Sequence, residues 1–298
     1  MSKTIIGISG WRYAPWRGVF YPKGLTQDQE LAFASRQFGG IELNGSFYSL
    51  QRPEYYARWY AQTPPGFVFT VKGSRFISHR LRLRDVEQPL TNFLASGIFN
   101  LREKLGPFLW QLPPSFRFDA ERLETFFALL PRHGEAAMRL ARRRDARMRG
   151  RVRLAIEPAQ RFRHALEARH ESFVDEAYIR LLRRYDIAAV VADTAGKWPY
   201  FEDVTAGFVY VRLHGDKKLY ASGYSGAALD RWATRVDAWR NGGELADANK
   251  ISEKAPAKRR GRDVFCFFDN DIKVKAPFDA HGLMQRLDLS APEWSAAA

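Results

Sequence analysis

Short apolar runs, rich in β-branched and aromatic residues, recur along the chain between longer segments of helical periodicity. Runs that are apolar at nearly every position are typical of parallel strands buried on both faces. Their alternation with helical segments indicates repeated βαβ units. The eight predicted strands are Thr4–Gly10, Gly40–Asn44, Phe67–Lys72, Pro107–Leu112, Val152–Glu157, Ile187–Asp193, Phe208–His214 and Val264–Asn270.

The intervening segments carry apolar residues at three- and four-residue spacings, which predicts amphipathic helices. Thr26 and Gln29 are spaced as a capping box, and Asp119 is a predicted N-cap. Gly97 is a weak point in the helical pattern that surrounds it. The segment 194–206 is too short for a full helix, so we expect one degenerate outer helix between the sixth and seventh strands.

Eight strands alternating with helices favour a closed (β/α)8 TIM barrel over an open doubly wound sheet. A dinucleotide-binding fold needs a complete glycine fingerprint after its first strand, and Gly7-Ile-Ser-Gly10-Trp11 lacks the second half of it. The chain has 298 residues. We therefore predict a single barrel domain over residues 1–298, with a basic insertion at about 241–262.

The cysteine content and the length of the apolar stretches indicate the cellular compartment of the protein. Cys266 is the single cysteine of the sequence, which excludes an intrachain disulfide and a thiolate metal site. No apolar stretch approaches the ~20 residues that a membrane helix needs. The sequence predicts a soluble, cytoplasmic protein without a membrane partner.

Lysine and arginine number 47 against 33 acidic residues, a net charge of +14. This balance favours an anionic partner, either a small molecule or nucleic acid; a solvated arginine-rich surface is the alternative. In a barrel, loops that precede strands lie on the bottom face, where we expect the basic runs Arg139–Arg153 and Lys254–Arg262 to be solvated or to make a secondary polyanion contact. The cations expected on the functional top face are Arg75, Arg80, Arg82, Arg84, Arg161, Arg163, Arg169, Lys197, Lys217 and Lys218.

Polar residues end most of the predicted strands, and barrel enzymes carry their chemistry at these ends. The candidates for acid–base catalysis are Glu42, Glu157, Asp193 and His214. Glu42 has an alternative role, a salt bridge to an arginine of a neighbouring strand. The candidates for substrate binding are Trp11, Asn44, Tyr48, Lys72, Arg75, His79, Gln111, Arg169, His170, Arg212, Tyr220 and Asn270.

No cofactor is assigned, and a divalent metal is left open. Glu42, Glu157, Asp193 and Asp269 would supply oxygen ligands for magnesium or manganese. We favour no tightly bound metal, because no two histidines have a diagnostic spacing. The sequence contains no HExxH, P-loop, GxSxG or CxxC motif.

Several of these segments together resemble the YecE-like family, a bacterial domain of unknown function numbered seventy-two. The opening segment, Gly7-Ile-Ser-Gly-Trp-Arg-Tyr-Ala-Pro-Trp-Arg-Gly-Val-Phe-Tyr-Pro22, is similar to the family's first signature. The other matching segments are Glu42-Leu-Asn-Gly-Ser-Phe-Tyr48, Lys72-Gly-Ser-Arg-Phe-Ile-Ser-His79, Lys104-Leu-Gly-Pro-Phe-Leu-Trp-Gln-Leu-Pro-Pro114 and Tyr210-Val-Arg-Leu-His-Gly215.

The resemblance implies a TIM barrel and brings no settled activity. The family tends to have a compact Glu-x-Arg-His-x-Ser stretch after the fifth strand. Here Glu157-Pro158 is separated from Arg169-His170-Glu-Ser172, so this chain is expected to depart from the family at that point.

Two functions of different classes follow. The first is an enzyme acting on an anionic, phosphate- or sugar-containing substrate, a hydrolase, lyase or isomerase, with Arg75 and Arg212 holding the anion. The second is a nucleic-acid-binding barrel without chemistry of its own. In both cases we predict that the polar residues at the strand ends surround one cavity.

Overall fold

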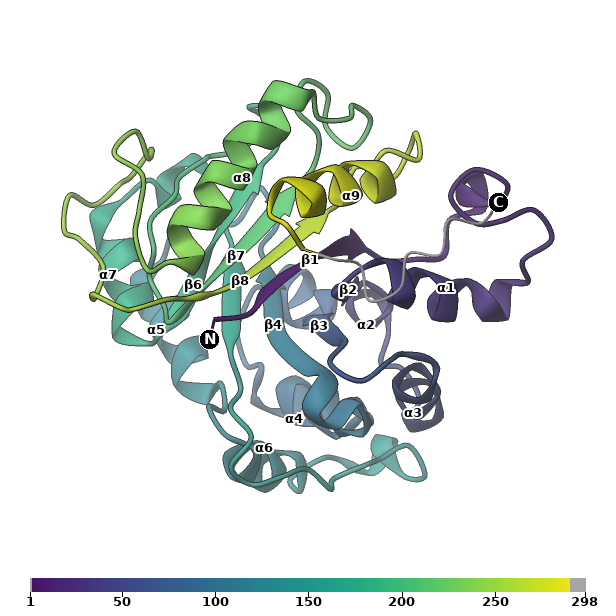
Figure 1. Ribbon diagram of the computed structural model, residues 1–298. Helices are drawn as coiled ribbons and strands as arrows, with labels where there is room; N and C mark the ends of the chain where they lie inside the picture. The colour runs from purple at the N-terminus through teal and green to yellow at the C-terminus, as the bar shows by residue number, and fades with distance from the viewer. Residues whose placement is uncertain (1, 290–298) are drawn as a thin grey trace. The chain divides into compact units, whose positions relative to one another are not determined.

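A computed structural model describes residues 2–289, in which eight strands form a closed parallel barrel in chain order (Figure 1). The barrel predicted from the sequence is confirmed. The strands are β1 (Thr4–Ser9), β2 (Gly40–Leu43), β3 (Val68–Lys72), β4 (Leu105–Gln111), β5 (His164–Glu167), β6 (Ile187–Asp193), β7 (Phe208–Leu213) and β8 (Asp263–Phe268).

Helices follow most strands. The α-helices are α1 (Glu30–Gln37), α2 (Gly45–Tyr48), α3 (Pro53–Gln62), α4 (Glu87–Ala95), α5 (Ala120–Leu129), α6 (Gly134–Ala141), α7 (Glu176–Arg184), α8 (Gly226–Arg240) and α9 (Ala276–Arg286). The short helical turns are η1 (Ala14–Trp16), η2 (Gln27–Gln29), η3 (Phe76–Arg80), η4 (Ile98–Lys104), η5 (Ala146–Met148) and η6 (Glu171–Phe173). Residues 194–206 contain no helix, as expected from the length of this segment.

Local signals explain several of these boundaries. The Asp119 side chain accepts a hydrogen bond from the Arg122 amide at the start of α5, and Thr26 and Gln29 form the predicted capping box at η2. Gly97 divides the helical pattern, because its φ of +104° lies in the left-handed region and ends the helix begun in α4. Pro53 Cα would lie 2.4 Å from a Cβ at this position, so no other residue fits.

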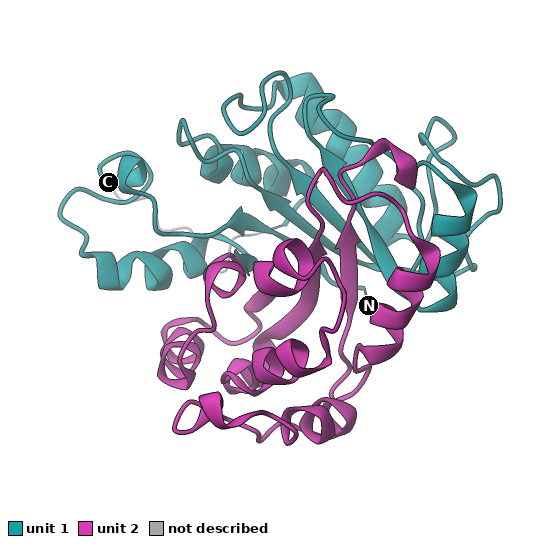
Figure 2. Cartoon of the chain, turned by 180° about the vertical axis from the view of Figure 1, so that it is seen from behind, with its two compact units in different colours: residues 1–42, 174–298 teal, residues 43–173 magenta. Residues whose placement is uncertain are grey.

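The chain divides into two compact units, residues 1–42 with 174–298 (unit 1) and residues 43–173 (unit 2), coloured separately in Figure 2. The prediction of a single domain also spans residue 1 and residues 290–298, which lie outside the described residues, and it stays a prediction. We describe the two units one at a time.

In unit 1, β7 pairs with β6 and β8, and β1 pairs with β8 and β2, all parallel. Ser9 lies opposite Glu42 across β1 and β2, and Ile8 lies opposite Phe268 across β1 and β8. Helices α8 and α9 contact each other, and both contact β8 (Figure 1). The register brings the carboxyl ends of these strands to the same level, where the polar residues of unit 1 gather.

In unit 2, β4 pairs in parallel with β3 and β5. Lys72 lies opposite Leu109, and Gln111 lies opposite Glu167. Helices α4 and α6 pack together outside these strands. The ends of β4 and β5 therefore place Gln111 and Glu167 side by side.

The predicted fifth strand is wrong. Residues 152–157 have no strand structure apart from an isolated bridge at Arg153, and β5 lies at His164–Glu167 instead. His164 is buried in this strand, with its ring nitrogens bonded to the Trp110 indole (3.2 Å) and to the Pro131 carbonyl (2.8 Å). Contacts with residues distant in sequence thus stabilise a strand that contains a histidine and a glutamate.

The basic insertion is folded at its end. Arg262, expected to be solvated, is 2% exposed and donates to the carbonyls of Gly242 (2.6 Å) and Ala257 (2.8 Å). Burial lowers the pKa of this guanidinium. Arg262 therefore ties both ends of the insertion to each other.

Candidate functional site

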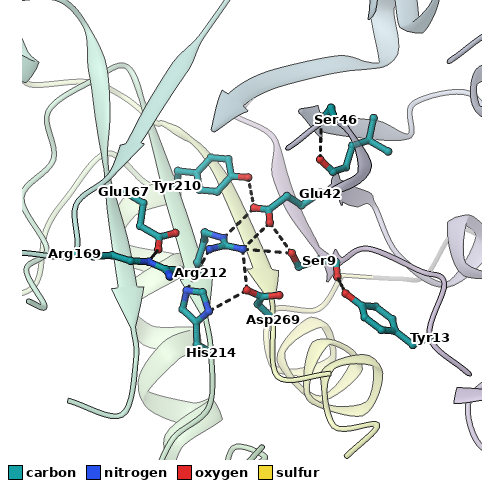
Figure 3. A network of polar contacts seen from close by, with 11 residues as sticks. Ser9, Tyr13, Glu42, Ser46, Glu167, Arg169, Tyr210, Arg212, His214 and Asp269 are labelled. Carbon is teal, nitrogen blue, oxygen red and sulfur yellow. Dashed lines mark hydrogen bonds and ion pairs between the residues drawn. The ribbon is translucent and has the colours of Figure 1, made fainter. Parts of the chain in front are cut away.

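The buried Arg212 is the centre of a polar cluster in unit 1 (Figure 3). It precedes the last residue of β7, and its side chain is fully buried. The guanidinium donates to Glu42 through Nε (3.0 Å to Oε2) and through a terminal nitrogen (2.7 Å to Oε1). The same terminal nitrogen lies 2.9 Å from Asp269 Oδ2. A paired fork of this kind holds both groups in one geometry.

Glu42 accepts two further hydrogen bonds, from the Ser9 hydroxyl to Oε1 (2.5 Å) and from the Tyr210 hydroxyl to Oε2 (2.7 Å). Both oxygens of this buried carboxylate are therefore engaged twice. The sequence suggested a salt bridge from Glu42 to an arginine of a neighbouring strand; Glu42 does pair with an arginine, but Arg212 belongs to β7, which pairs with β6 and β8. A role for Glu42 in proton transfer stays a prediction.

His214 joins the cluster from the end of β7. Its Nδ1 lies 3.0 Å from Asp269 Oδ2, and its Nε2 lies 3.4 Å from an Arg212 terminal nitrogen. The ring of Tyr220 stands edge-on at 5.3 Å from the imidazole, and the Tyr220 amide donates to the His214 carbonyl. Tyr220 adopts φ +61°, a conformation that this backbone contact stabilises.

Asp193 ends β6 beside this cluster, and its carbonyl accepts from the His214 amide (2.9 Å). The Tyr224 hydroxyl donates to Asp193 Oδ2 (3.1 Å). Burial raises the pKa of Asp193, with a smaller opposing contribution from the Ala195 amide. Burial also raises the pKa of Asp271, to about 6, and the charge of Asp269 adds to the shift.

Two other predicted binding residues of unit 1 are occupied by structural contacts. The Asn270 amide nitrogen donates to the Ser222 carbonyl (2.9 Å) and to Asp279 Oδ2 (2.7 Å), which fixes the loop after β7. Trp11 follows β1 and is 7% exposed, and its carbonyl accepts from the Tyr21 hydroxyl (2.6 Å). Both lie near strand ends, as predicted.

A second charged cluster follows β3 in unit 2. Lys72 ends the strand, is 8% exposed, and has its Nζ 4.5 Å from the centre of the Phe47 ring. Gly73 comes next, and a Cβ there would lie 2.3 Å from the Trp110 ring. Only glycine allows the chain to turn away from the barrel at this point.

The chain then forms one π-helical turn, η3, in which the Leu81 amide donates to the Phe76 carbonyl (2.9 Å). Such turns are rare and occur frequently at functional sites. Arg75 immediately precedes η3, and its guanidinium lies 5.4 Å from the centre of the Tyr48 ring. Tyr48 is 64% exposed, so this pair faces solvent.

His79 lies within η3, edge-on to Phe47 at 5.1 Å. Its Nδ1 lies 2.9 Å from the Ser78 hydroxyl. Burial lowers the pKa of His79 to about 4, and three cations lower it further. These cations are Lys72, Arg169 and Arg75, against which Glu167 is the opposing carboxylate.

Glu167 was missed by the sequence analysis, which named Glu157 at this position. Glu157 is exposed and lies in an irregular segment, where it lines a pocket with Leu105, the first residue of β4. It is therefore at the opposite end of β4 from Gln111. Glu167 ends β5, is fully buried, and accepts from Arg169 Nε at 2.5 Å.

This assignment also corrects the departure from the family pattern. Glu167-Ala-Arg169-His170-Glu-Ser172 is a compact Glu-x-Arg-His-x-Ser stretch directly after β5. His170 Nδ1 accepts from the Ser172 amide (3.0 Å), and the Ser172 hydroxyl accepts from the Phe118 amide (2.8 Å). The motif itself was the signal that could have located the strand.

The remaining candidates of unit 2 also lie at strand ends. Gln111 ends β4 and is 5% exposed. Asn44 follows β2, and its carbonyl accepts from the Phe47 amide at the start of α2 (3.1 Å). Unit 2 thus gathers Lys72, Arg75, Arg169 and Glu167 around His79, whereas unit 1 gathers Glu42, Arg212, His214 and Asp269.

Within residues 2–289, no group of three or more histidine, cysteine, aspartate or glutamate side chains could together hold a metal ion. In the same range, none of the helices combines the length and apolarity needed to cross a bilayer.

The family model described as "Protein of unknown function DUF72" matches residues 5–297. The protein UPF0759 protein YecE of Escherichia coli K12 is 33% identical over 111 residues, which are 37% of this chain and 38% of that protein. The match therefore spans less than half the length of this curated relative.

Two solved structures share the fold. A DUF72 family protein (TM1631) of Thermotoga maritima has a TM-score of 0.73 at 24% identity, over 96% of this chain and 99% of that one. A DUF72 family protein (EF0366) of Enterococcus faecalis has a TM-score of 0.67 at 16% identity, over 96% of each chain. With a family match that runs from the first strand to beyond the last helix, the chain belongs to the DUF72 family.

Proposed function

We propose that this chain is a barrel enzyme whose substrate carries a phosphate or another anionic group, bound by the unit 2 cluster. The observation that carries the proposal is the charge balance around His79. Lys72, Arg169 and Arg75 all lower the pKa of this partly buried histidine, and Glu167 raises it. An excess of positive charge in a partly buried site attracts an anion, and an arginine fork matches phosphate oxygens.

The aromatic residues of the same cluster support a substrate with a ring. Phe47 underlies the Lys72 ammonium, and the exposed Tyr48 ring lies against Arg75. An aromatic face next to cations suits the ring of a sugar or a base that carries the anionic group. A phosphorylated sugar combines both features.

His79 is the group of this cluster that we propose for proton transfer. With a pKa near 4, its imidazole is neutral at neutral pH and is available as a base. The Ser78 hydroxyl lies 3.4 Å from the Ser74 carbonyl, and donation to that carbonyl leaves Ser78 Oγ to accept from His79 Nδ1–H. In this tautomer Nε2 is the basic nitrogen.

The binding step is tested with inorganic phosphate and a panel of phosphorylated sugars, by thermal unfolding and calorimetry. We expect phosphate to stabilise the wild-type chain and to bind Lys72→Gln/Arg75→Gln about tenfold or more weakly, since charge-assisted hydrogen bonds are lost. The matched control is Arg142→Gln/Arg144→Gln, which removes the same charge from an exposed part of unit 2. An equal loss in both double variants would contradict a defined site.

Turnover is tested separately. His79→Gln should leave phosphate binding in place and abolish conversion of any panel member that the wild type converts. If the wild type binds phosphorylated sugars and His79→Gln converts them at the wild-type rate, His79 is not the base.

The exposed pair of Tyr48 and Arg75 favours a second candidate, a nucleic-acid-binding barrel without chemistry of its own. Stacking of an unpaired base on an exposed tyrosine beside an arginine is typical of single-strand binding. The net charge of +14 agrees with this function. Tight binding of single-stranded oligonucleotides that weakens steeply with salt, and that Tyr48→Ala removes, would favour it over the enzyme.

A further inference from the structure

An arginine-lined pocket opens in unit 2 at the amino-terminal end of β4, which begins at Leu105. Its volume is about 740 Å³, within the range of pockets that hold small ligands. Arg102, Arg153 and Arg161 line it, together with the apolar side chains of Leu105 and Ile156. The cluster around His79 follows the carboxyl end of β3 instead, so the pocket is a separate feature of the unit.

The backbone around Arg102 is held in a specific conformation. Arg102 has φ +48°, which is unfavourable for a residue other than glycine. The Gln160 side-chain amide donates to its carbonyl (2.8 Å), and its guanidinium lies 5.1 Å from the centre of the Tyr60 ring. These contacts hold Arg102 in place in the pocket wall.

Two acidic residues line the pocket beside the three arginines. Glu103 accepts from the Tyr60 hydroxyl (2.9 Å), and the ring of this tyrosine also lies against the Arg102 guanidinium. Glu157 is the other acidic residue of the lining. The basic run 139–153, expected from the sequence to make a polyanion contact, ends in the pocket at Arg153.

Gly134 contacts the segment 157–160, which contributes Glu157 and Gln160 to the pocket lining. Its amide donates to the Gln160 carbonyl (2.9 Å), and the next amide, of Glu135, donates to the Pro158 carbonyl (3.0 Å). A Cβ on Gly134 would lie 2.1 Å from the Glu157 carbonyl oxygen, so a side chain there would push the segment 157–160 outward. Glycine at this position keeps the pocket in shape.

We propose that this pocket is a second ligand site, which binds a phosphorylated small molecule of about nucleotide size. Three guanidinium groups supply donors for phosphate oxygens, and Leu105 and Ile156 supply an apolar surface for the rest of the molecule. The inference does not depend on the function proposed for the cluster around His79.

The experiment is calorimetric titration of the full chain with ADP and with inorganic pyrophosphate. Arg153→Gln/Arg161→Gln should weaken binding of ADP by about tenfold or more, because each arginine contributes charge-assisted hydrogen bonds. Arg142→Gln/Arg144→Gln, with the same loss of charge in the adjoining run, should bind ADP as the wild type does. Lys72→Gln/Arg75→Gln should leave the affinity of the pocket for ADP unchanged, which distinguishes the two sites.

Thermal unfolding of each variant without ligand checks the fold, and the single variant Arg153→Gln replaces the double one if the latter is unstable. Absence of binding by the wild type to both probes would overturn the proposal. So would equal weakening by the control pair, or loss of ADP binding in Lys72→Gln/Arg75→Gln alone. Binding of a single-stranded oligonucleotide at the pocket without binding of ADP would assign it to a polymer instead and would also overturn it.

Discussion

The two charged clusters at the strand ends differ in how far their charges are matched. In unit 1, Arg212 is enclosed by Glu42 and Asp269, both within 3.0 Å, and is fully out of contact with solvent. In unit 2, the pair of Arg169 and Glu167 is similarly buried, but Lys72 and Arg75 add two cations near it. Both clusters contain a buried arginine–glutamate pair, and the cluster of unit 2 has Lys72 and Arg75 as further cations.

This difference separates structural from ligand-binding arginines. A buried arginine with both ends of its fork paired is held in place and holds its neighbours in place. A cluster with surplus cations lowers the pKa of its own histidine and is better satisfied when an anion enters. We therefore propose that Arg212 positions Glu42, rather than holding an anion as expected from the sequence alone, and that Lys72 and Arg75 bind the anion.

The largest expected effect is that of Arg212→Met on stability. This substitution leaves Glu42 buried without its arginine, which should lower the free energy of unfolding by about 3–5 kcal/mol. Urea unfolding of this variant, of Glu42→Leu and of the double variant should give a cycle in which the double variant loses less than the two single variants together. Additive losses would contradict the pairing.

Arg212→Met also tests whether the two clusters differ in phosphate binding. Phosphate should raise the unfolding temperature of Arg212→Met as much as that of the wild type, because the cluster around His79 is unchanged. In Arg169→Met that stabilisation should be reduced. Equal responses of both variants to phosphate would remove the distinction between the two clusters.

Seven of the eight strands could be predicted because their runs are apolar almost throughout, as the burial of both faces requires. The fifth could not. Residues 152–157 are apolar at four of six positions and imitate a strand, whereas His164–Glu167 has only four residues and includes two that titrate. Its stability depends on the Trp110 indole and the Pro131 carbonyl, which satisfy His164 from other elements.

The sequence analysis found the candidate residues from their positions at strand ends. It could not identify the side chains that contact them. Lys72, Arg75 and His79 could be named because each ends or follows β3. That Arg212 is fully engaged and that Arg75 is not buried follows from side-chain geometry, which one sequence does not contain. The error in strand five carried over directly to Glu157, because every site residue was chosen from a strand end.

A smaller effect is expected for Gly73→Ala in unit 2. The added Cβ would lie 2.3 Å from the Trp110 ring, which is 1% exposed and has little room to move. Overpacking of this kind costs about 1–3 kcal/mol, and the shift of Lys72 should also weaken phosphate binding. The matched control is Gly45→Ala, where the nearest atom would be 3.5 Å away, at the end of the Gln51 side chain. Urea unfolding that shows equal stability of both variants would contradict the close approach.

Acid should destabilise both units through one buried histidine in each. The pKa of His79 in unit 2 and that of His281 in unit 1 are both lowered to about 4, each mainly by burial. The unfolded chain takes up these protons below about pH 6.5, so both contribute stability that is lost as the pH falls from about 6.5 towards 4. His79→Gln and His281→Gln should each reduce the decrease in the free energy of unfolding between these pH values, as measured by urea unfolding.

Adding phosphate should distinguish His79 from His281. Cations lower the pKa of His79, whereas burial alone lowers that of His281, with the Gln37 backbone opposing it. A bound anion should therefore raise the pKa of His79 and leave that of His281 unchanged. Titration of the two imidazoles by NMR, assigned with the glutamine variants, measures both; parallel shifts would indicate a general salt effect.

The smallest expected effect is the difference between Lys72 and Arg75 in how far each lowers the pKa of His79. The charge of Lys72 lowers the pKa of His79 more than the charge of Arg75 does, because the buried Lys72 is less screened by solvent than the exposed Arg75. Lys72→Gln should accordingly raise the pKa of His79 further than Arg75→Gln does, with phosphate absent in both titrations. Arg142→Gln, distant in the chain and exposed, should leave it unchanged. If Arg75→Gln produces the larger rise in the NMR titration, the exposed arginine lies closer to the imidazole in solution, and anion binding should then be assigned to Arg75 rather than to Lys72.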